Sequence, residues 1–417
     1  MKKDYFKNHW HKLDNVAKVF SMDQENNTNM FRYSVILKQN INKSILTKAL
    51  QKSLETFKSY KVKLGSGLFW NYLEYNSKNP LVTKEDEIPC QHIKFKRNND
   101  YLFKVTYYKN KINLDVFHVL TDGAGALKFL KSIISNYLSL KYKLKYPKQT
   151  GNLLYQDQYL KNYDKKIKTK NKYIPAYQLP GKINKNINNT YHYIIDILKI
   201  KKVCKENQVT ITEYITALYI YAIYLSMYHK KVKKDIVITL PIDLRKYYKV
   251  DTLSNFFVCT NINANINQKA KTTFKDILNQ VHYEFKEKLE LDNIKSYLTR
   301  DVKLGTNIII RLVPLPIKKT IMKLVFTIAG TTSTSTLSNV GIIDIENKYK
   351  KYIDNILVLV MPNKKEKMKC SICSYDSKLN ITINSRIDDT KFEKTFFKLL
   401  ETQITNIKLE SNTNLIK

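Results

Sequence analysis

The chain has 417 residues and a formal net charge of +36, from 72 Lys and Arg against 36 Asp and Glu. Its hydrophobic content of 43%, with 12% aromatic residues, supports buried cores and excludes a disordered chain, and its length suits two of them. Five cysteines in a chain this long exclude a disulfide framework and favour a reduced, cytoplasmic compartment.

The positive charge has two explanations. Basic chains attract nucleic acid, anionic membranes and polyanionic ligands. Arg is scarce, however, while Lys, Asn and Ile are abundant together, as an AT-rich coding sequence would produce, and the lysines form only short clusters such as 165–172 and 230–234. We favour the compositional explanation, and we expect no specific nucleic-acid binding.

The first part of the chain, 1–150, is predicted to be an α+β unit. Leu46, Leu50 and Leu54 recur at helical spacing and predict a helix over 43–57. The N-terminal run MKKDYFKNHWHKLD has no apolar region, so we expect no signal peptide. Strands are predicted at 31–37, 68–75, 101–108 and 111–118, the last two as a hairpin across Lys109 and Asn110.

The second part is predicted to be another α/β unit, 191–417, after a linker at 151–190 that is rich in Lys, Asn, Tyr and Pro and has little periodicity. The apolar run 215–228 is shorter than the ~20 residues that a spanning helix needs, so we predict a buried helix and no transmembrane span. Strands are expected at 191–198, 235–240, 357–361, 371–375 and 379–385, and helices from 200, over 212–229 and over 390–402.

Cys370 and Cys373 form a lone CxxC within a predicted strand, 368–375. Residues three apart on a strand face opposite sides, and no second Cys pair lies nearby. We therefore expect no metal site here.

The apolar segment 308–329 is interrupted by Pro314 and Pro316 and carries scattered basic residues. Two interpretations are open: a core helix broken by the prolines, or a helix that lies on a membrane surface. We favour core packing and leave peripheral membrane contact as the alternative.

The most informative run is FHVLTDGAG, from Phe117 to Gly125. His118 ends a strand-like row of apolar residues, and helical spacing resumes after Gly123 and Gly125, which places the motif at a strand-to-helix turn. A neutral imidazole there can take a proton from a hydroxyl or amine. From the pattern alone, an equally good interpretation is a core histidine followed by Asp122 as a helix N-cap.

HxxxDG, here His118 to Gly123, is the signature of the chloramphenicol acetyltransferase-like superfamily, which includes alcohol O-acetyltransferases and the condensation domains of peptide synthetases. Further stretches resemble its stand-alone alcohol acetyltransferase branch, in the order of that branch. They are KLDNVAKVF (12–20), GLFWNYLEYN (67–76), LPIDLRKYY (240–248), LSNFFVCTNI (253–262) and TLSNVG (336–341). Condensation domains usually carry a second His where Phe117 stands, and the DFGWG motif of plant acyltransferases is missing. Both departures favour the alcohol acetyltransferase branch.

This resemblance implies two α/β sandwich halves that face each other across a central active-site tunnel. It implies His118 as general base, and Asp122 turned from substrate and paired with Arg245, whose fork suits a carboxylate. Gly123 would allow close backbone approach. Ser338 or Asn339 would supply an oxyanion donor. For Ser254–Phe257 (SNFF), we favour a core strand after a turn over a tunnel-lining segment.

The implied activity is transfer of an acyl group from a thioester, such as acyl-CoA as co-substrate, to a small-molecule or lipid alcohol. We expect no permanently bound cofactor, and we expect the protein to be a monomer. A positive field would favour coenzyme A phosphates or an acidic acyl carrier protein. The alternatives are a condensation-type enzyme with an amine acceptor or carrier-bound donor, and a non-catalytic binding protein on the same fold.

Overall fold

The computed structural model describes residues 10–22, 29–146, 155–169, 173–183, 188–229, 232–266 and 270–412. Most of the N-terminal run used for the signal-peptide expectation lies outside these residues. So do parts of the predicted linker and parts of the two Lys clusters.

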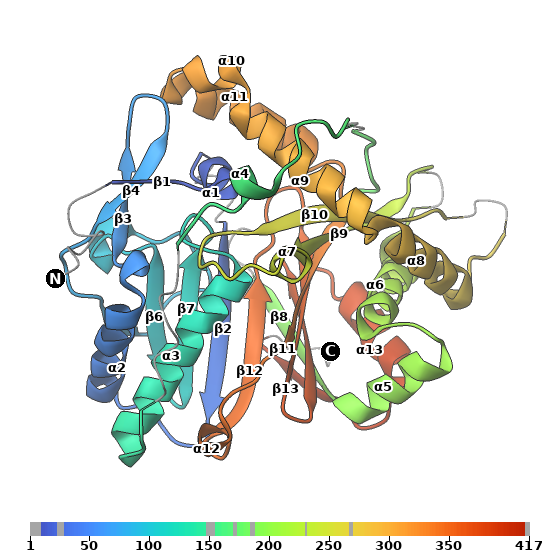
Figure 1. Ribbon diagram of the computed structural model, residues 1–417. Helices are drawn as coiled ribbons and strands as arrows, with labels where there is room; N and C mark the ends of the chain where they lie inside the picture. Colours follow the sequence, from blue (N-terminus) through green and yellow to red (C-terminus); the bar gives the residue numbers. More distant parts are fainter. Residues whose placement is uncertain are drawn as a thin grey trace.

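Two large sheets and one small sheet organise the described chain (Figure 1). The five-stranded sheet has the order β12 (Ile353–Val360), β2 (Met30–Leu37), β7 (Lys111–Phe117), β6 (Phe103–Tyr108) and β5 (Val82–Lys84). The seven-stranded sheet has the order β10 (Phe257–Ala264), β9 (Ile236–Asp243), β11 (Ser335–Ile342), β13 (Met368–Tyr375), β14 (Lys378–Ser385), β8 (Asn189–Asp196) and β15 (Lys408–Ser411). The small sheet has the order β1 (His11–Lys12), β4 (Asn71–Tyr75) and β3 (Val62–Ser66).

Helices pack on the outer face of each large sheet (Figure 1). The five-stranded sheet is covered by α2 (Lys43–Thr56) and α3 (Gly123–Tyr142). The seven-stranded sheet is covered by α5 (Ile197–Glu206), α6 (Ile211–Met227), α8 (Phe274–Lys288) and α13 (Lys391–Glu401). The remaining helices are α1 (Asn15–Phe20), α4 (Tyr159–Asn162), α7 (Arg245–Tyr248), α9 (Leu291–Thr306), α10 (Ile308–Leu312), α11 (Leu315–Ala329) and α12 (Asn347–Lys350), with 3₁₀ turns at Lys58–Tyr60 and Phe95–Asn98.

Most predicted elements are confirmed. The hairpin joins β6 to β7 with Tyr108 opposite Lys111, and Lys109 adopts the positive φ of 50° that a two-residue turn favours. The apolar run 215–228 forms most of the largely buried α6, with Tyr228 as its C-cap. Within the described residues no single helix is long and apolar enough to span a membrane, and α5 and α6 pass such a test only as a pair, bent by 84°.

One strand belongs to the other sheet. The run 357–361, predicted in the second unit, forms the end of β12 except for Met361, and β12 pairs antiparallel with β2 of the first unit. Side chains of β13 then bond to β12 carbonyls: Ser371 Oγ donates to Val358 O at 2.7 Å and Cys373 Sγ to Ile356 O at 3.3 Å. The N-terminal sheet therefore includes a strand from far along the chain. The boundary at 151–190 stays a prediction.

The favoured interpretation of 308–329 as a core helix is wrong. The segment forms α10 and α11, with a break at Pro314, and of the described α11 side chains only Leu315 and Lys318 are buried. Hydrophobic content alone could not distinguish a packed helix from an exposed one, because no neighbouring element was known to cover it.

Candidate active site

A pocket of about 520 Å³ lies between the two large sheets and contains the predicted residues. Its N-terminal wall includes Phe31, His118 and the start of α3, and its C-terminal wall includes Phe257 and Ser338. Several of the other lining side chains are apolar: Phe20, Met30, Leu127, Pro241, Val340, Val358, Val360 and Met361. Asp122, Gly123, Arg245 and Asn339 also line the pocket, so the structure brings the predicted set together.

The His118 ring is enclosed by aromatic rings. It directly follows β7, and its backbone N–H donates to Asn29 O at 2.9 Å. Phe31, Phe20 and Phe257 place their ring centroids 4.5, 4.9 and 5.8 Å from the imidazole. Burial lowers the pKa of His118 from 6.5 to about 4, although nearby Asp122 and the hydrogen bond with Asn255 act in the opposite direction. The imidazole is therefore neutral near pH 7.

Asn255 decides which ring nitrogen carries the proton. Its Nδ2 donates to Asp14 Oδ2 at 2.9 Å and to His118 O at 3.0 Å, which turns Oδ1 toward His118 Nδ1, 3.4 Å away. An amide oxygen only accepts hydrogen bonds, so Nδ1 must be the protonated nitrogen. Nε2 is left as the basic nitrogen of a ring that lines the pocket.

Asp14 holds Asn255 in turn. Its Oδ2 accepts from the Asn255 backbone N–H at 3.1 Å, and its Oδ1 caps α1 by accepting from Ala17 N at 2.7 Å. Neither residue has a local pattern that predicts a role, although both fall in stretches that carry the resemblance, KLDNVAKVF and LSNFFVCTNI. The favoured assignment of 254–257 to a core strand is wrong, because β10 begins only at Phe257 and the preceding residues form a loop against the site.

Asp122 performs both of its alternative roles. It caps α3, accepting from Gly125 N at 3.0 Å, and it pairs with Arg245 through two bonds, Nη1 to Oδ2 at 2.9 Å and Nη2 to Oδ1 at 3.0 Å. Its Oδ2 also accepts from Phe256 N at 2.8 Å. The carboxylate is thus fully occupied, which suits a structural role.

Arg245 shapes the facing loop. Beyond Asp122, its guanidinium donates to Asp243 Oδ1 at 2.9 Å, to Thr252 O at 3.1 Å and to Ser254 O at 2.8 Å. Burial lowers the pKa of Arg245, but Asp122 and Asp243 outweigh it and raise that pKa overall. All five N–H groups are used, so Arg245 fixes the loop that presents Asn255.

Of the two motif glycines, Gly125 is the one without room for a side chain. A Cβ at Gly125 would lie 2.0 Å from Thr121 Oγ1 and 2.8 Å from Leu253 O, whereas at Gly123 it would meet only Tyr33 Oη, at 3.3 Å. Thr121 Oγ1 donates to Leu253 O at 2.7 Å. The close approach therefore occurs at Gly125, and it lets α3 meet the loop of the second half.

Ser338 and Asn339 lie on β11 and differ in their hydrogen bonding. The Asn339 amide nitrogen donates to Thr212 Oγ1 at 2.7 Å, and its oxygen accepts from Gly341 N at 2.8 Å. Since the Asn339 amide serves these bonds, Ser338 is the better candidate to donate into the pocket.

Within the described residues there is no group of three or more metal-ligating side chains. The CxxC strand is confirmed as β13, with Cys370 and Cys373 in different cores.

Comparison with solved structures shows the fold. Polyketide synthase associated protein 5 from Mycobacterium tuberculosis aligns with a TM-score of 0.63 at 14% identity, over 95% of this chain and 98% of that one. A trichothecene 15-O-acetyltransferase from Fusarium sporotrichioides gives 0.61 at 10% identity, over 94% of both chains. The first condensation domain of the CDA synthetase gives 0.61 at 10%, over 95% and 94%. No family model and no curated protein matches the chain.

The expected fold is thereby confirmed: this chain has the fold that acetyltransferases and condensation domains share, over nearly its whole length.

We predict that Asp122→Ala and Arg245→Ala are strongly coupled in stability. Removing one partner of a buried pair costs about 3–5 kcal/mol, because the other charge stays buried without compensation. The double variant should therefore lose much less than the sum of the single losses, as measured by denaturant unfolding in a double-mutant cycle. Additive losses would show that the two side chains do not act as a unit.

The two glycines allow a matched test of packing. Both lie in the first turn of α3, where Ala is favoured over Gly by about 1 kcal/mol. Gly123→Ala should therefore leave the free energy of unfolding unchanged or raise it, whereas Gly125→Ala should lower it by about 1–3 kcal/mol through overpacking. Equal effects of the two substitutions in urea unfolding would refute the close contact at Gly125.

Proposed function

We propose that the chain is a thioester-dependent acyltransferase that moves an acyl group from acyl-CoA to a hydroxyl acceptor, with His118 as general base. The observation that carries this proposal is the hydrogen bonding of Asn255, which leaves Nε2 of a neutral imidazole as the basic nitrogen in a partly apolar pocket. A neutral, oriented imidazole is what removal of a hydroxyl proton requires.

In the proposed reaction, His118 Nε2 takes the acceptor proton while the acceptor oxygen attacks the thioester carbonyl carbon. The carbonyl oxygen becomes an oxyanion that the Ser338 hydroxyl can stabilise. The tetrahedral intermediate then expels the thiolate, the carbon–sulfur bond breaks, and His118 returns the proton to sulfur. Atoms and charge balance without a covalent acyl-enzyme, and Asp122 and Arg245 act only as positioning residues.

Two features support acyl-CoA as donor. The apolar lining suits an acyl chain, and Lys131 in the lining supplies positive charge for phosphates. Two further lining lysines already have carboxylate partners: Lys128 pairs with Asp251, and Lys369 pairs with Glu366 at 2.9 Å. The starter condensation domain of rhizomide synthetase, which aligns with a TM-score of 0.60 at 9% identity over 95% of each chain, has been solved with C8-CoA and Leu-SNAC.

A hydroxyl acceptor is favoured over an amine by Phe117. Condensation domains usually carry a second His at this place, whereas here a buried phenyl ring packs near Phe95 and His92. The cytoplasmic location and the monomeric state remain part of this proposal.

Replacement of the base tests the proposal. We expect His118→Ala to fold and to lose about 10²–10⁴ in acyl transfer, the usual contribution of a positioned base. The assay is thiol release from acetyl-CoA and octanoyl-CoA with octanol as acceptor. His192→Ala is the matched control, since His192 also has its pKa lowered to about 4 by burial but does not line the pocket. Full turnover by His118→Ala would refute the assignment.

The pH dependence gives a second test. Only neutral His118 can accept a proton, so kcat/KM should fall as the pH drops through about 4, the lowered pKa of His118. Asp14→Asn is the control, because burial raises the pKa of Asp14 to about 7, so a step near pH 7 that is absent from Asp14→Asn belongs to Asp14 and not to His118. A loss of activity centred near pH 6.5 that persists in Asp14→Asn would contradict a buried, neutral base.

A further inference from the structure

Large apolar side chains gather on one surface formed by α10, α11 and the turn between β3 and β4. Figure 1 shows α10 and α11 at the top of the molecule, away from the helices that cover the sheets. Leu324 is 63% exposed and Ile308 71%. We call this the α11 surface; its exposed apolar members are Leu68, Phe69, Ile308, Leu312, Ile317, Ile321, Leu324, Val325 and Ile328.

The helix turns its apolar stripe outward. Ile317, Ile321, Leu324 and Ile328 recur at intervals of four, three and four residues, so they share one face of α11. The two buried residues of α11, Leu315 and Lys318, lie on a different face. An apolar face normally packs on a core, whereas this one is exposed to solvent.

The surface is held together by hydrogen bonds. Leu315 N donates to Leu68 O at 2.8 Å, and Lys318 Nζ donates to Phe69 O at 2.9 Å. Lys318 Nζ also lies 3.5 Å from the centre of the Trp70 ring. These contacts fix the β3–β4 turn beside α11, so the exposed side chains of Leu68 and Phe69 lie next to the helix.

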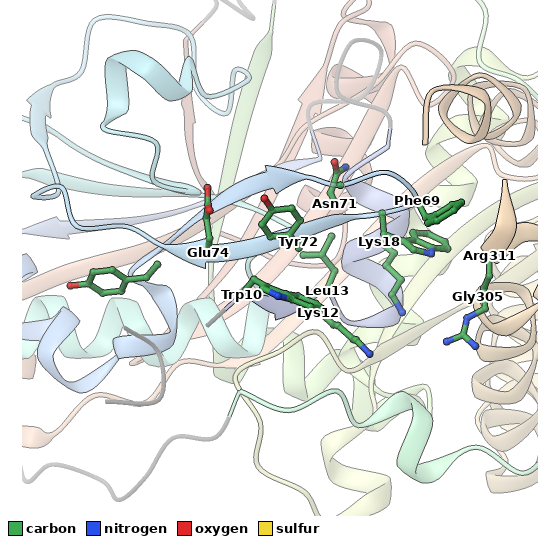
Figure 2. Close-up of a pocket in the computed structure, with 13 residues that line it drawn as sticks. Trp10, Lys12, Leu13, Lys18, Phe69, Asn71, Tyr72, Glu74, Gly305 and Arg311 are labelled. Carbon is green, nitrogen blue, oxygen red and sulfur yellow. The ribbon is translucent and has the colours of Figure 1, made fainter. Parts of the chain in front are cut away.

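A cationic recess adjoins this surface (Figure 2). It encloses about 850 Å³ and is lined by Lys12, Lys18 and Arg311 together with Trp10 and Trp70. Burial lowers the pKa of Lys18, and Arg311 and Lys12 lower it further, although Asp157 and Asp14 oppose them. One carboxylate, Glu74, also lines the recess and pairs with Lys63 at 3.0 Å.

We propose that the α11 surface docks on a phospholipid bilayer that carries anionic headgroups. Apolar side chains on one helical face, with basic residues on the opposite face, are typical of a helix that lies in the membrane interface. Lys319 and Lys323 on α11 and Arg311 on α10 provide positive charge at the level of the headgroups. The recess would then receive a lipid phosphate, because its cations repel one another and an anion relieves that repulsion.

A second copy of this chain would fit the surface less well. Each copy carries a formal charge of +36, so two copies repel, whereas an anionic bilayer attracts each of them. The proposal does not depend on acyl transfer, because lipid binding can be measured without substrate.

The experiment is co-sedimentation of the full chain with phosphatidylcholine vesicles, with and without phosphatidylglycerol. We expect binding that is stronger with phosphatidylglycerol and about tenfold or more weaker in Leu324→Glu, since a buried leucine contributes roughly that factor. Loss should be greater in Ile321→Glu/Leu324→Glu. Both side chains are exposed, so these variants should keep the thermal unfolding midpoint of the parent.

Leu198→Glu is the matched control, because Leu198 is 69% exposed and lies on α5, at the opposite end of the molecule (Figure 1). It adds the same charge, so its binding should stay within about twofold of the parent. Equal losses in Leu198→Glu and Leu324→Glu would show attraction by net charge alone and would overturn the proposal. So would absence of vesicle binding, including the case in which the chain forms a dimer that Leu324→Glu dissociates.

Discussion

The buried pair of Asp122 and Arg245 is the interaction on which the site depends. Asp122 begins α3 in the first half of the chain, and Arg245 follows β9 in the second, so the bidentate bond joins segments 123 residues apart. A buried ion pair adds little net stability compared with apolar packing, but it is costly to break. Its value here is geometric. The same guanidinium holds the carbonyls of Thr252 and Ser254 and so fixes the loop that ends in Asn255.

That geometry reaches His118 through Asn255. The amide contacts His118, and its orientation is set by Asp14, which also caps α1. The segments around Asp14, Arg245 and Asn255 thus decide the tautomer of one imidazole. Low dielectric strengthens each of these bonds, and the same burial lowers the pKa of His118.

Local patterns explain what the sequence could predict. The strand, turn and helix around His118 have short-range periodicity, so their places were predictable, as was the hairpin across Lys109. The pairing with Arg245 came from the motif order of a known superfamily. The contact between Asn255 and His118 spans 137 residues and has no local signature, because an Asn before a strand is equally suited to a turn.

The same limit explains the errors. A continuous apolar run identifies β12 as a strand, but pairing with β2 depends on hydrogen bonds to a segment over 300 residues earlier, which the local pattern does not encode. In α11, the hydrophobic content predicts a helix, but it does not show that the apolar face is exposed. The local pattern predicts that a helix or strand forms. Whether its apolar face is buried depends on whether another element of the fold packs against it.

The helix α1 gives the two proposals a physical connection. Lys18 lines the cationic recess beside the α11 surface, and Phe20, two residues later, lines the pocket of His118. A lipid held at the recess would therefore lie one short helix away from His118. For an enzyme whose acceptor is a lipid alcohol, docking at this surface would bring the acceptor from a bilayer to the pocket without full exposure to water, which the apolar surface and the pocket lining both favour.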